Sequence, residues 1–211
     1  MAQLAGYAIL LLVGWTSGIS IYLTVAILGI SSRAGWVELP GALQTISNPF
    51  IIGFAIILYL IEFIADKVPY VDSMWDSVHT FIRPAGAALA GYMAGTENGP
   101  VVQTALALFT GTLALDSHAV KASSRLAINT SPEPVSNIVA SIAEHSLVFF
   151  LYWFFIKHPV LACSLIIVFV ILSYFILKLL WRFVRAVFGK VLGLFSNHSE
   201  VKSPTNIRTK K

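Results

Sequence analysis

The run MAQLAGYAILLLVGWTSGISIYLTVAILGISS (residues 1–32) contains no charged side chain. A helix needs about 20 apolar residues to cross the hydrocarbon core of a bilayer, so this run is long enough for a crossing. It is too long for the core of a signal peptide, and it lacks a basic segment and a small-residue cleavage site. We therefore predict a retained first membrane-spanning helix over residues 4–30.

The rest of the chain shows the same long apolar runs. Of its 211 residues, 57% are hydrophobic and 11% are charged, and the mean hydropathy is +0.80. The runs are continuous, and a bilayer leaves helices or closed barrels as the ways to pair the backbone, so we predict an all-α protein. We expect a polytopic membrane helix bundle of about six transmembrane helices, some short or broken. The predicted spans are 4–30, 48–65, 78–95, 100–124, 135–157 and 159–180.

Prolines mark the predicted junctions between spans, because proline removes a backbone donor and disrupts a helix. They are Pro40, Pro69, Pro84, Pro132, Pro134 and Pro159. Residues 85–95 are mostly Ala and Gly, which favours close helix packing in the short third span. We predict a single transmembrane domain over residues 1–190 and a basic, disordered tail over residues 191–211.

The basic residues predict the orientation. If the chain starts inside, most of them fall in the loops after the second and fourth spans and in the tail, and the opposite side holds Arg33 and Lys157. The positive-inside rule then predicts a multi-pass inner (plasma) membrane protein with both termini in the cytoplasm. We expect the basic C-terminal end to contact anionic lipid headgroups, and we expect no nucleic-acid partner.

A weak internal repeat is also visible. Ser31-Ser32-Arg33 recurs as Ser123-Ser124-Arg125, and at the same offset Pro40 matches Pro132. Two halves of three spans each would face opposite ways, which is the 3+3 inverted repeat of many transporters. The alternative is chance, since Ser and Pro are common at span ends.

The segment EFIADKVPYVDSMWDSVHTFIRP (62–84) holds a first cluster of ionisable residues. Asp72, Asp76, His79 and Arg83 are spaced to form one helix face. Such groups cost about 2.5–3.5 kcal/mol each near lipid, so they predict a role. The face could bind a hydrated cation, relay protons through His79, or hold a metal through Asp72, Asp76 and His79. The alternative is a helix start capped by Asp72, which leaves His79 and Arg83 unexplained.

The segment LDSHAVKASSRLAINTSPEPVSN (115–137) holds a second cluster. His118, Lys121 and Arg125 form a cationic face on the predicted helix, and Asp116 points to another side. The polar, proline-broken linker that follows is tolerated near lipid only when it is buried in protein or lines a wet cavity. Ser136 or Asn137 could cap the fifth span and attract an anion. The alternative is a cytoplasmic loop whose basic residues meet lipid headgroups.

The two clusters would offset each other's burial if they met, either as a static latch or as a gate. Glu62, Glu144 and His145 lie deeper in apolar runs, where we expect pairing with a basic residue of a neighbouring span, or a proton path. The candidate site for an ion or substrate comprises Glu62, Asp66, Asp72, Asp76, His79, Arg83, His118, Lys121, Arg125, Asn129, Ser131, Glu133, Ser136 and Asn137.

Three strings resemble the signatures of one bacterial membrane-protein family, domain of unknown function 4126. They are SGISIYLTVAILGISSRAG (17–35), EFIADKVPYVDSMWDSVHTFIRP (62–84) and KASSRLAINTSPEPVSN (121–137). The resemblance covers roughly residues 5–180. It implies a small polytopic inner-membrane protein, and it carries no catalytic residues to transfer.

These features favour transport or permeation of a small charged solute, either an ion or an anionic lipid headgroup. One alternative is a non-transporting assembly or partner protein. Under either hypothesis the protein could be a homo-oligomer. Another is a membrane-embedded metal-dependent hydrolase, but the chain has no His-Glu-x-x-His motif and no nucleophile elbow, so we do not expect an enzyme or a cofactor. A polar cavity between the two clusters would favour transport, and faces packed without a cavity would favour the latch.

Overall fold

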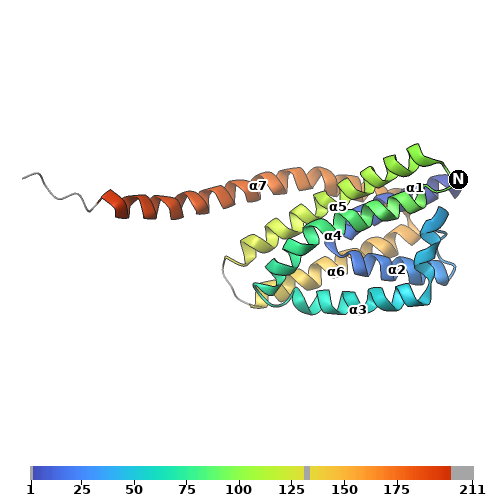
Figure 1. Cartoon of the computed structure of the whole chain (residues 1–211), viewed down its shortest axis with the longest axis horizontal. Helices are drawn as coiled ribbons and strands as arrows, with labels where there is room; N and C mark the ends of the chain where they lie inside the picture. Colours follow the sequence, from blue (N-terminus) through green and yellow to red (C-terminus); the bar gives the residue numbers. More distant parts are fainter. Residues whose placement is uncertain (1, 131–133, 201–211) are drawn as a thin grey trace, which may run out of the picture.

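The computed structural model describes residues 2–130 and 134–200, and these residues form helices and no strands. The all-α prediction is confirmed for this part of the chain (Figure 1). The helices are α1 (Ala2–Ile19), α2 (Ile21–Arg33), the 3-10 helix η1 (Gly41–Ser47), α3 (Pro49–Ala65), α4 (Val71–Ala94), α5 (Pro100–Ile128), α6 (Pro134–Lys157) and α7 (Pro159–Glu200).

Four helices begin with a proline, at Pro49, Pro100, Pro134 and Pro159. The first N–H groups of a helix have no partner within it, so a proline there loses nothing, and its fixed φ suits the helix. Before α3, the Asn48 side chain also accepts a hydrogen bond of 2.9 Å from the N–H of Phe50. Proline therefore sets where these four helices start.

Pro84 is different, because it lies inside α4. The predicted junction at Pro84 is wrong, and the helix begins at Val71, before the predicted start of the third span at residue 78. The Ala- and Gly-rich half of α4 does pack closely, as the sequence predicts. Ala87 is fully buried, and the Thr110 hydroxyl of α5 donates a 2.7 Å hydrogen bond to its carbonyl.

The first predicted span is wrong, because α1 and α2 fold back on each other at Ser20. Ser20 has extended backbone geometry, with φ −152° and ψ 103°. Thr16 and Thr24 lie four residues to either side, and their hydroxyl oxygens are 3.1 Å apart. In one continuous helix, eight residues would separate them by about 12 Å along the axis. Residues 4–30 therefore form a helical hairpin with its tip inside the bundle.

The bundle has two ends, which we name by their loops. The Asp66 end contains the α3–α4 loop, the end of α5 and the start of α6. The Trp36 end contains the start of α1, the end of α2, η1 and the α4–α5 loop (Figure 1). Helices α3 to α7 each run between the two ends. The start of α1 and the far end of α7 lie at opposite ends of the bundle. The structure does not place these ends relative to a membrane, so the expectation of both termini in the cytoplasm stays a prediction.

Two helical stretches in the described residues are long and apolar enough to cross a membrane, namely Pro134–Lys157 and Pro159–Arg182. The bent pair of η1 and α3, which meet at 70°, makes a third if it is counted as one span. Hydropathy therefore supports a membrane protein. The hairpin replaces one of the six predicted spans, and the exact number of crossings stays a prediction.

The interior of the bundle is divided into an apolar and a polar half. The hairpin and η1 form an apolar core toward the Trp36 end. Its fully or almost fully buried members include Leu12, Leu23, Leu28, Leu39, Leu43 and Leu151. A Cβ on Gly18 of α1 would collide with the Ser117 hydroxyl and the Ala114 carbonyl of α5, so glycine is needed for this close approach. The polar half lies between the hairpin tip and the Asp66 end.

The predicted repeat pairs α2, α3 and α4 with α5, α6 and α7. Paired helices run in opposite directions (Figure 1), as an inverted repeat requires. However, α2 has 13 residues and α5 has 29. The inverted repeat stays a prediction.

Helix α7 extends past the bundle and past the predicted domain boundary at residue 190. Its backbone is helical to Glu200, including residues 191–200 that the sequence predicts to be disordered, and residues 201–211 lie outside the described part. Lys178 lies 5.9 Å from the Tyr174 ring and Arg185 lies 5.6 Å from the Trp181 ring. Such basic and aromatic pairs are typical of a helix leaving a membrane interface.

Candidate functional site

The polar half of the bundle contains two adjoining sets of hydrogen-bonded and ion-paired side chains, which meet at the backbone of the hairpin and which we together call the buried ion network. Nearly all its members are almost completely buried, and Asn129 and Glu144 are half-buried. Its members are Ser20, Glu62, Asp66, Asp72, Asp76, Arg83, His118, Lys121, Arg125, Asn129, Asn137 and Glu144.

Arg83 of α4 forms the inner layer of the network, and its side chain is fully buried. Its Nη2 lies 2.7 Å from Glu62 Oε1, and its Nη1 lies 2.9 Å from Asp76 Oδ1. Nη1 also lies 2.7 Å from His118 Nδ1. Because arginine only donates, Nδ1 must accept, so His118 is neutral with its proton on Nε2. That proton faces the Thr80 hydroxyl at 2.9 Å.

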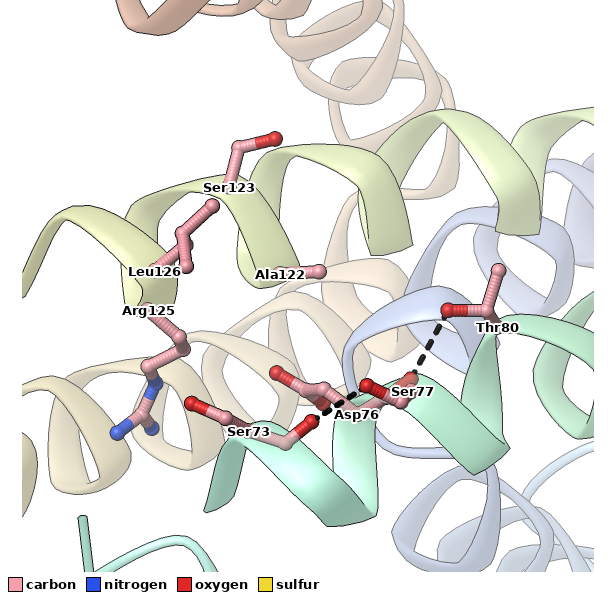
Figure 2. A pocket seen from close by; sticks show the side chains of 8 residues that line it. All are labelled: Ser73, Asp76, Ser77, Thr80, Ala122, Ser123, Arg125 and Leu126. Carbon is pink, nitrogen blue, oxygen red and sulfur yellow. Dashed lines mark hydrogen bonds between the residues drawn. The ribbon is translucent and has the colours of Figure 1, made fainter. Parts of the chain in front are cut away.

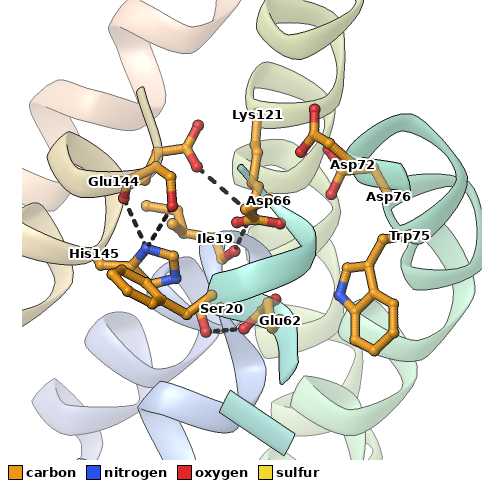
Figure 3. Close-up of polar contacts among 12 residues, drawn as sticks. Ile19, Ser20, Glu62, Asp66, Asp72, Trp75, Asp76, Lys121, Glu144 and His145 are labelled. Carbon is orange, nitrogen blue, oxygen red and sulfur yellow. Dashed lines mark hydrogen bonds and ion pairs between the residues drawn. The ribbon is translucent and has the colours of Figure 1, made fainter. Parts of the chain in front are cut away.

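The hairpin tip contacts this inner layer directly. The Ser20 hydroxyl donates to Glu62 Oε2 and accepts from the N–H of Leu23 at 3.3 Å. The carbonyl of Ile19 accepts from Lys121 Nζ at 3.2 Å, as Figure 3 shows beside Ser20 and Glu62. The negative C-terminal end of the α1 dipole thus faces a cation, and the positive N-terminal end of α2 faces a carboxylate.

Lys121 and Arg125 of α5 form the middle layer. Lys121 Nζ lies 2.7 Å from Asp66 Oδ2 and 3.5 Å from Glu144 Oε2. Arg125 binds Glu144 through two parallel contacts, Nη2 to Oε2 at 2.7 Å and Nε to Oε1 at 3.1 Å. Bidentate pairs of this kind are strong and orient both side chains. The layer therefore ties α3, α5 and α6 together.

Two asparagines complete the outer layer at the Asp66 end. Arg125 Nη1 donates to Asn137 Oδ1 at 3.2 Å and lies 3.8 Å from Asp72 Oδ1. Asn137 donates to Asn129 Oδ1 at 2.7 Å, and Asn129 donates to Asp72 Oδ2 at 3.1 Å. These bonds close a ring that connects α4, α5 and α6.

The network contains more carboxylates than cations. Its carboxylates are Glu62, Asp66, Asp72, Asp76 and Glu144, and its cations are Arg83, Lys121 and Arg125. With all of them ionised, the network has a formal charge of −2. An uncompensated charge inside a membrane protein is costly. Protonation of the carboxylates, or a bound small cation, would lower this cost.

Three carboxylate oxygens of the network are buried without a hydrogen-bond donor among the described residues. They are Asp66 Oδ1, Asp72 Oδ1 and Asp76 Oδ2. In each case the other oxygen of the carboxylate is bonded. An unpaired buried polar atom costs about 1–3 kcal/mol, so these oxygens have capacity for a ligand.

A pocket of about 260 Å³ lies beside the network, between α4 and α5. Figure 2 shows its lining, with Asp76 on α4 and Arg125 on α5. The sequence posed a choice between a polar cavity and faces that pack together. The structure contains both, because the ion pairs close the centre of the network and the pocket lies along one side of it.

Most of the predicted site residues meet in this network, but several do so in a different way. The acidic and basic faces do contact each other, although Asp76 pairs with Arg83 of its own helix. The expected pairing of Glu62 and Glu144 with basic residues of neighbouring helices is confirmed. Asp116 points away, as predicted, and accepts from Ser173 of α7 at 2.6 Å.

Two predicted helix caps are wrong. Asp72 lies inside the first turn of α4, where the N-cap position is Tyr70, and its side chain is buried in the network. Asn137 lies in the first turns of α6, which starts at Pro134, and its side chain bonds Arg125 and Asn129 instead of the helix end. Ser136 is half-buried in the same turn. Ser131 and Glu133 lie outside the described residues.

His79 does not join a metal site. Its Nδ1 lies 2.8 Å from the Trp75 carbonyl and its Nε2 lies 3.1 Å from the Tyr22 hydroxyl. Among the described residues, no three carboxylate, imidazole or thiol groups are placed to hold a metal ion. The geometry therefore does not support the predicted set of Asp72, Asp76 and His79.

Sequence reasoning missed Ser20 and did not include Glu144 in the site. The only sequence signal for Ser20 is the short polar stretch Thr16-Ser17-Gly18 before it, in the middle of an apolar run. Glu144 stands beside His145 in an otherwise mostly apolar predicted span, which indicates that it needs an ionic partner but does not identify that partner. Neither signal indicates the three-dimensional arrangement.

Comparison with known protein families gives one match. Residues 8–179 match the family described as Domain of unknown function (DUF4126). The chain belongs to this family. The DUF4126 region contains the whole network, from Ser20 to Glu144, together with the hairpin from residue 8 onward. No curated protein and no solved structure matches the chain.

Proposed function

We propose that this protein moves a small cation across the membrane through the buried ion network. The carboxylate excess carries the proposal, since the network pairs five carboxylates with three cations in the bundle interior. Two protons or two monovalent cations would make it neutral. Ionisable groups inside membrane domains are costly, and they commonly mark ion pathways or proton relays.

The same charges argue against an anion or an anionic lipid headgroup as the solute. Arg83, Lys121 and Arg125 each contact a carboxylate at 2.7 Å. An incoming anion would have to displace these carboxylates, and the released carboxylate would stay buried without a partner. A cation needs no such exchange.

The broken helix at the centre of the bundle supports transport. In many transporters, interrupted helices expose their dipole ends and free backbone groups near the membrane midplane, where the solute binds. Here the hairpin tip at Ser20 contacts Glu62 and Lys121, while the apolar core fills the interior beyond it. We infer a polar path from the Asp66 end to the tip, with the hairpin as the barrier that must move.

We propose that the Asp66 end faces the cytoplasm. Lys67 lies at this end, and α7 leaves the bundle in this direction with Lys178, Arg182 and Arg185. The Trp36 end has Arg33 and Lys157. The positive-inside rule then places the start of α1 on the external side.

A second candidate is a static latch in a non-transporting membrane protein. The short ion pairs of Arg83 and Arg125 favour it, because such pairs hold α3, α4, α5 and α6 in register. A latch needs no carboxylate excess and no free carboxylate oxygens. For this reason we rank it second.

Ion flux into proteoliposomes separates the two. Purified protein is reconstituted, and uptake of Na⁺, K⁺ and protons is followed under imposed gradients. We expect flux of at least one cation, and we expect Glu62→Gln to abolish it, while Glu38→Gln, at an exposed position in the Trp36 end, serves as the matched control. Absence of any cation flux from folded wild-type protein would favour the latch.

A further inference from the structure

The pocket between α4 and α5 has walls of a particular chemistry. Its α4 wall consists of Ser73, Asp76, Ser77 and Thr80, so every residue on that wall carries an oxygen in its side chain. The α5 wall adds Ala122, Ser123, Arg125 and Leu126. Histidine, cysteine and methionine are absent from the lining, which leaves oxygen as the only ligand type that accepts a metal ion there.

Two of these hydroxyls have their protons directed away from the pocket. Ser77 donates to the Ser73 carbonyl at 2.8 Å, and Thr80 donates to the Asp76 carbonyl at 2.9 Å. A hydroxyl that donates to its own helix keeps lone pairs for other partners. Thr80 uses one of these for His118 Nε2. The wall therefore offers acceptors.

Asp76 supplies the negative charge of the pocket, and its side chain is buried. Its relative exposure is 3%, and it is one of the residues that line the pocket. Oδ1 binds Arg83 at 2.9 Å, while Oδ2 receives no hydrogen bond from any residue that the structure describes. A buried carboxylate oxygen without a donor, beside a pocket of acceptors, points to a cation.

We propose that this pocket is a binding site for a small alkali-metal cation, with Asp76 Oδ2 as its charged ligand and the Ser77 and Thr80 hydroxyls as neutral ligands. Oxygen ligands suit hard cations, and one carboxylate suits a single positive charge. Divalent and transition metals usually need more charged or imidazole ligands than this pocket has. The inference rests on the proposed cation transport and names the cargo class and its binding residue.

Sodium binding to the purified full chain tests the site. Na⁺ is titrated into protein in detergent with choline as the background cation, and the heat of binding is measured. Asp76→Asn retains an oxygen for Arg83 but removes the charge, so we expect Na⁺ affinity to fall on the order of tenfold or more. Ser77→Ala should weaken it by about two- to fivefold.

Ser164→Ala is the matched control, since Ser164 of α7 also donates to the carbonyl four residues before it and lies outside the pocket. Its affinity should equal that of wild type. If Asp76→Asn does not fold, Ser77→Ala decides. Equal Na⁺ affinity in wild type and every variant, or no Na⁺ binding at all, overturns the site.

The two proposals can fail separately. Cation flux in proteoliposomes without Asp76-dependent Na⁺ binding overturns this site and leaves the transport proposal in place. Asp76-dependent Na⁺ binding without flux of any cation overturns transport and leaves the site in place.

Discussion

Arg83 is the residue on which the inner layer of the network depends. It is fully buried and compensates both Glu62 and Asp76. A buried ion pair is weak evidence for net stability, but removing one partner leaves the other charge uncompensated. The main effect of losing Arg83 would therefore be that the charges of Glu62 and Asp76 stay buried without compensation.

We predict that Arg83→Gln lowers the free energy of unfolding by about 3–5 kcal/mol. Thermal unfolding of the protein in detergent would show this as a lower melting temperature. The double variant Arg83→Gln/Glu62→Gln removes one of the two orphaned carboxylates, so it should be more stable than the single variant. A single variant as stable as wild type would contradict the importance of this pair.

At the residue scale, the sequence predicted which residues form the site better than it predicted which of them contact each other. Helical spacing correctly placed Asp72, Asp76, His79 and Arg83 on one buried face of α4. The sequence predicted that Glu62 pairs with a basic residue of a neighbouring helix, but spacing within one helix does not identify partners on others, so the specific partners of Glu62 and Asp66 could not be predicted. Ser20 stands in an uncharged run, where the short polar stretch before it gives no sign of a partner on another helix.

The hairpin of α1 and α2 is the element that shapes the bundle. Its close approach to α5 depends on Gly18, where a Cβ would meet the Ser117 side chain and the Ala114 carbonyl. We predict that Gly18→Ala destabilises the protein by about 1–3 kcal/mol through overpacking. Gly53→Ala on α3 is the matched control, because a Cβ there meets nothing within 4 Å. Equal melting temperatures of the two variants would contradict this packing.

The reversal at Ser20 can be tested by a crosslink. In a Cys163→Ser background, Thr16→Cys/Thr24→Cys should form an intramolecular disulfide on mild oxidation, because the hydroxyl oxygens that the sulfurs replace are 3.1 Å apart. In a continuous helix the two residues are about 12 Å apart, too far for a disulfide. Mass spectrometry of the intact chain gives the answer, and two free thiols after oxidation would exclude the hairpin.

At the element scale, apolar length was a good guide for α3, α5 and α6 and a poor one for residues 4–30. A run of 27 uncharged residues fits one span or a folded pair equally well, since both bury apolar side chains on every face. The predicted junction at Pro84 was wrong because the sequence does not show how a helix is packed. A helix packed against others can tolerate an internal proline because its neighbours compensate for the lost hydrogen bond.

At the scale of the whole molecule, the described residues form five helices that run between the two ends of the bundle, and one hairpin. If all five cross the membrane, as we propose, the start of α1 and the end of α7 face opposite sides. We predict that Lys67→Cys and Trp36→Cys, each in the Cys163→Ser background, react with a membrane-impermeant maleimide from opposite sides. Trp36 is 65% exposed and should react from outside in intact cells. Lys67→Cys should react only after the membrane is opened. Labelling of both from one side would contradict the topology.

The central claim is that the buried ion network carries positive charge through the membrane. The sign of the transported charge tests it most directly, and it can be read from the current in a planar bilayer or solid-supported membrane that contains the purified protein. Under a gradient of a sodium salt, we predict a current whose sign follows the cation and which Glu62→Gln abolishes. A current that follows the anion, or no current and no cation uptake from folded protein, would contradict the account.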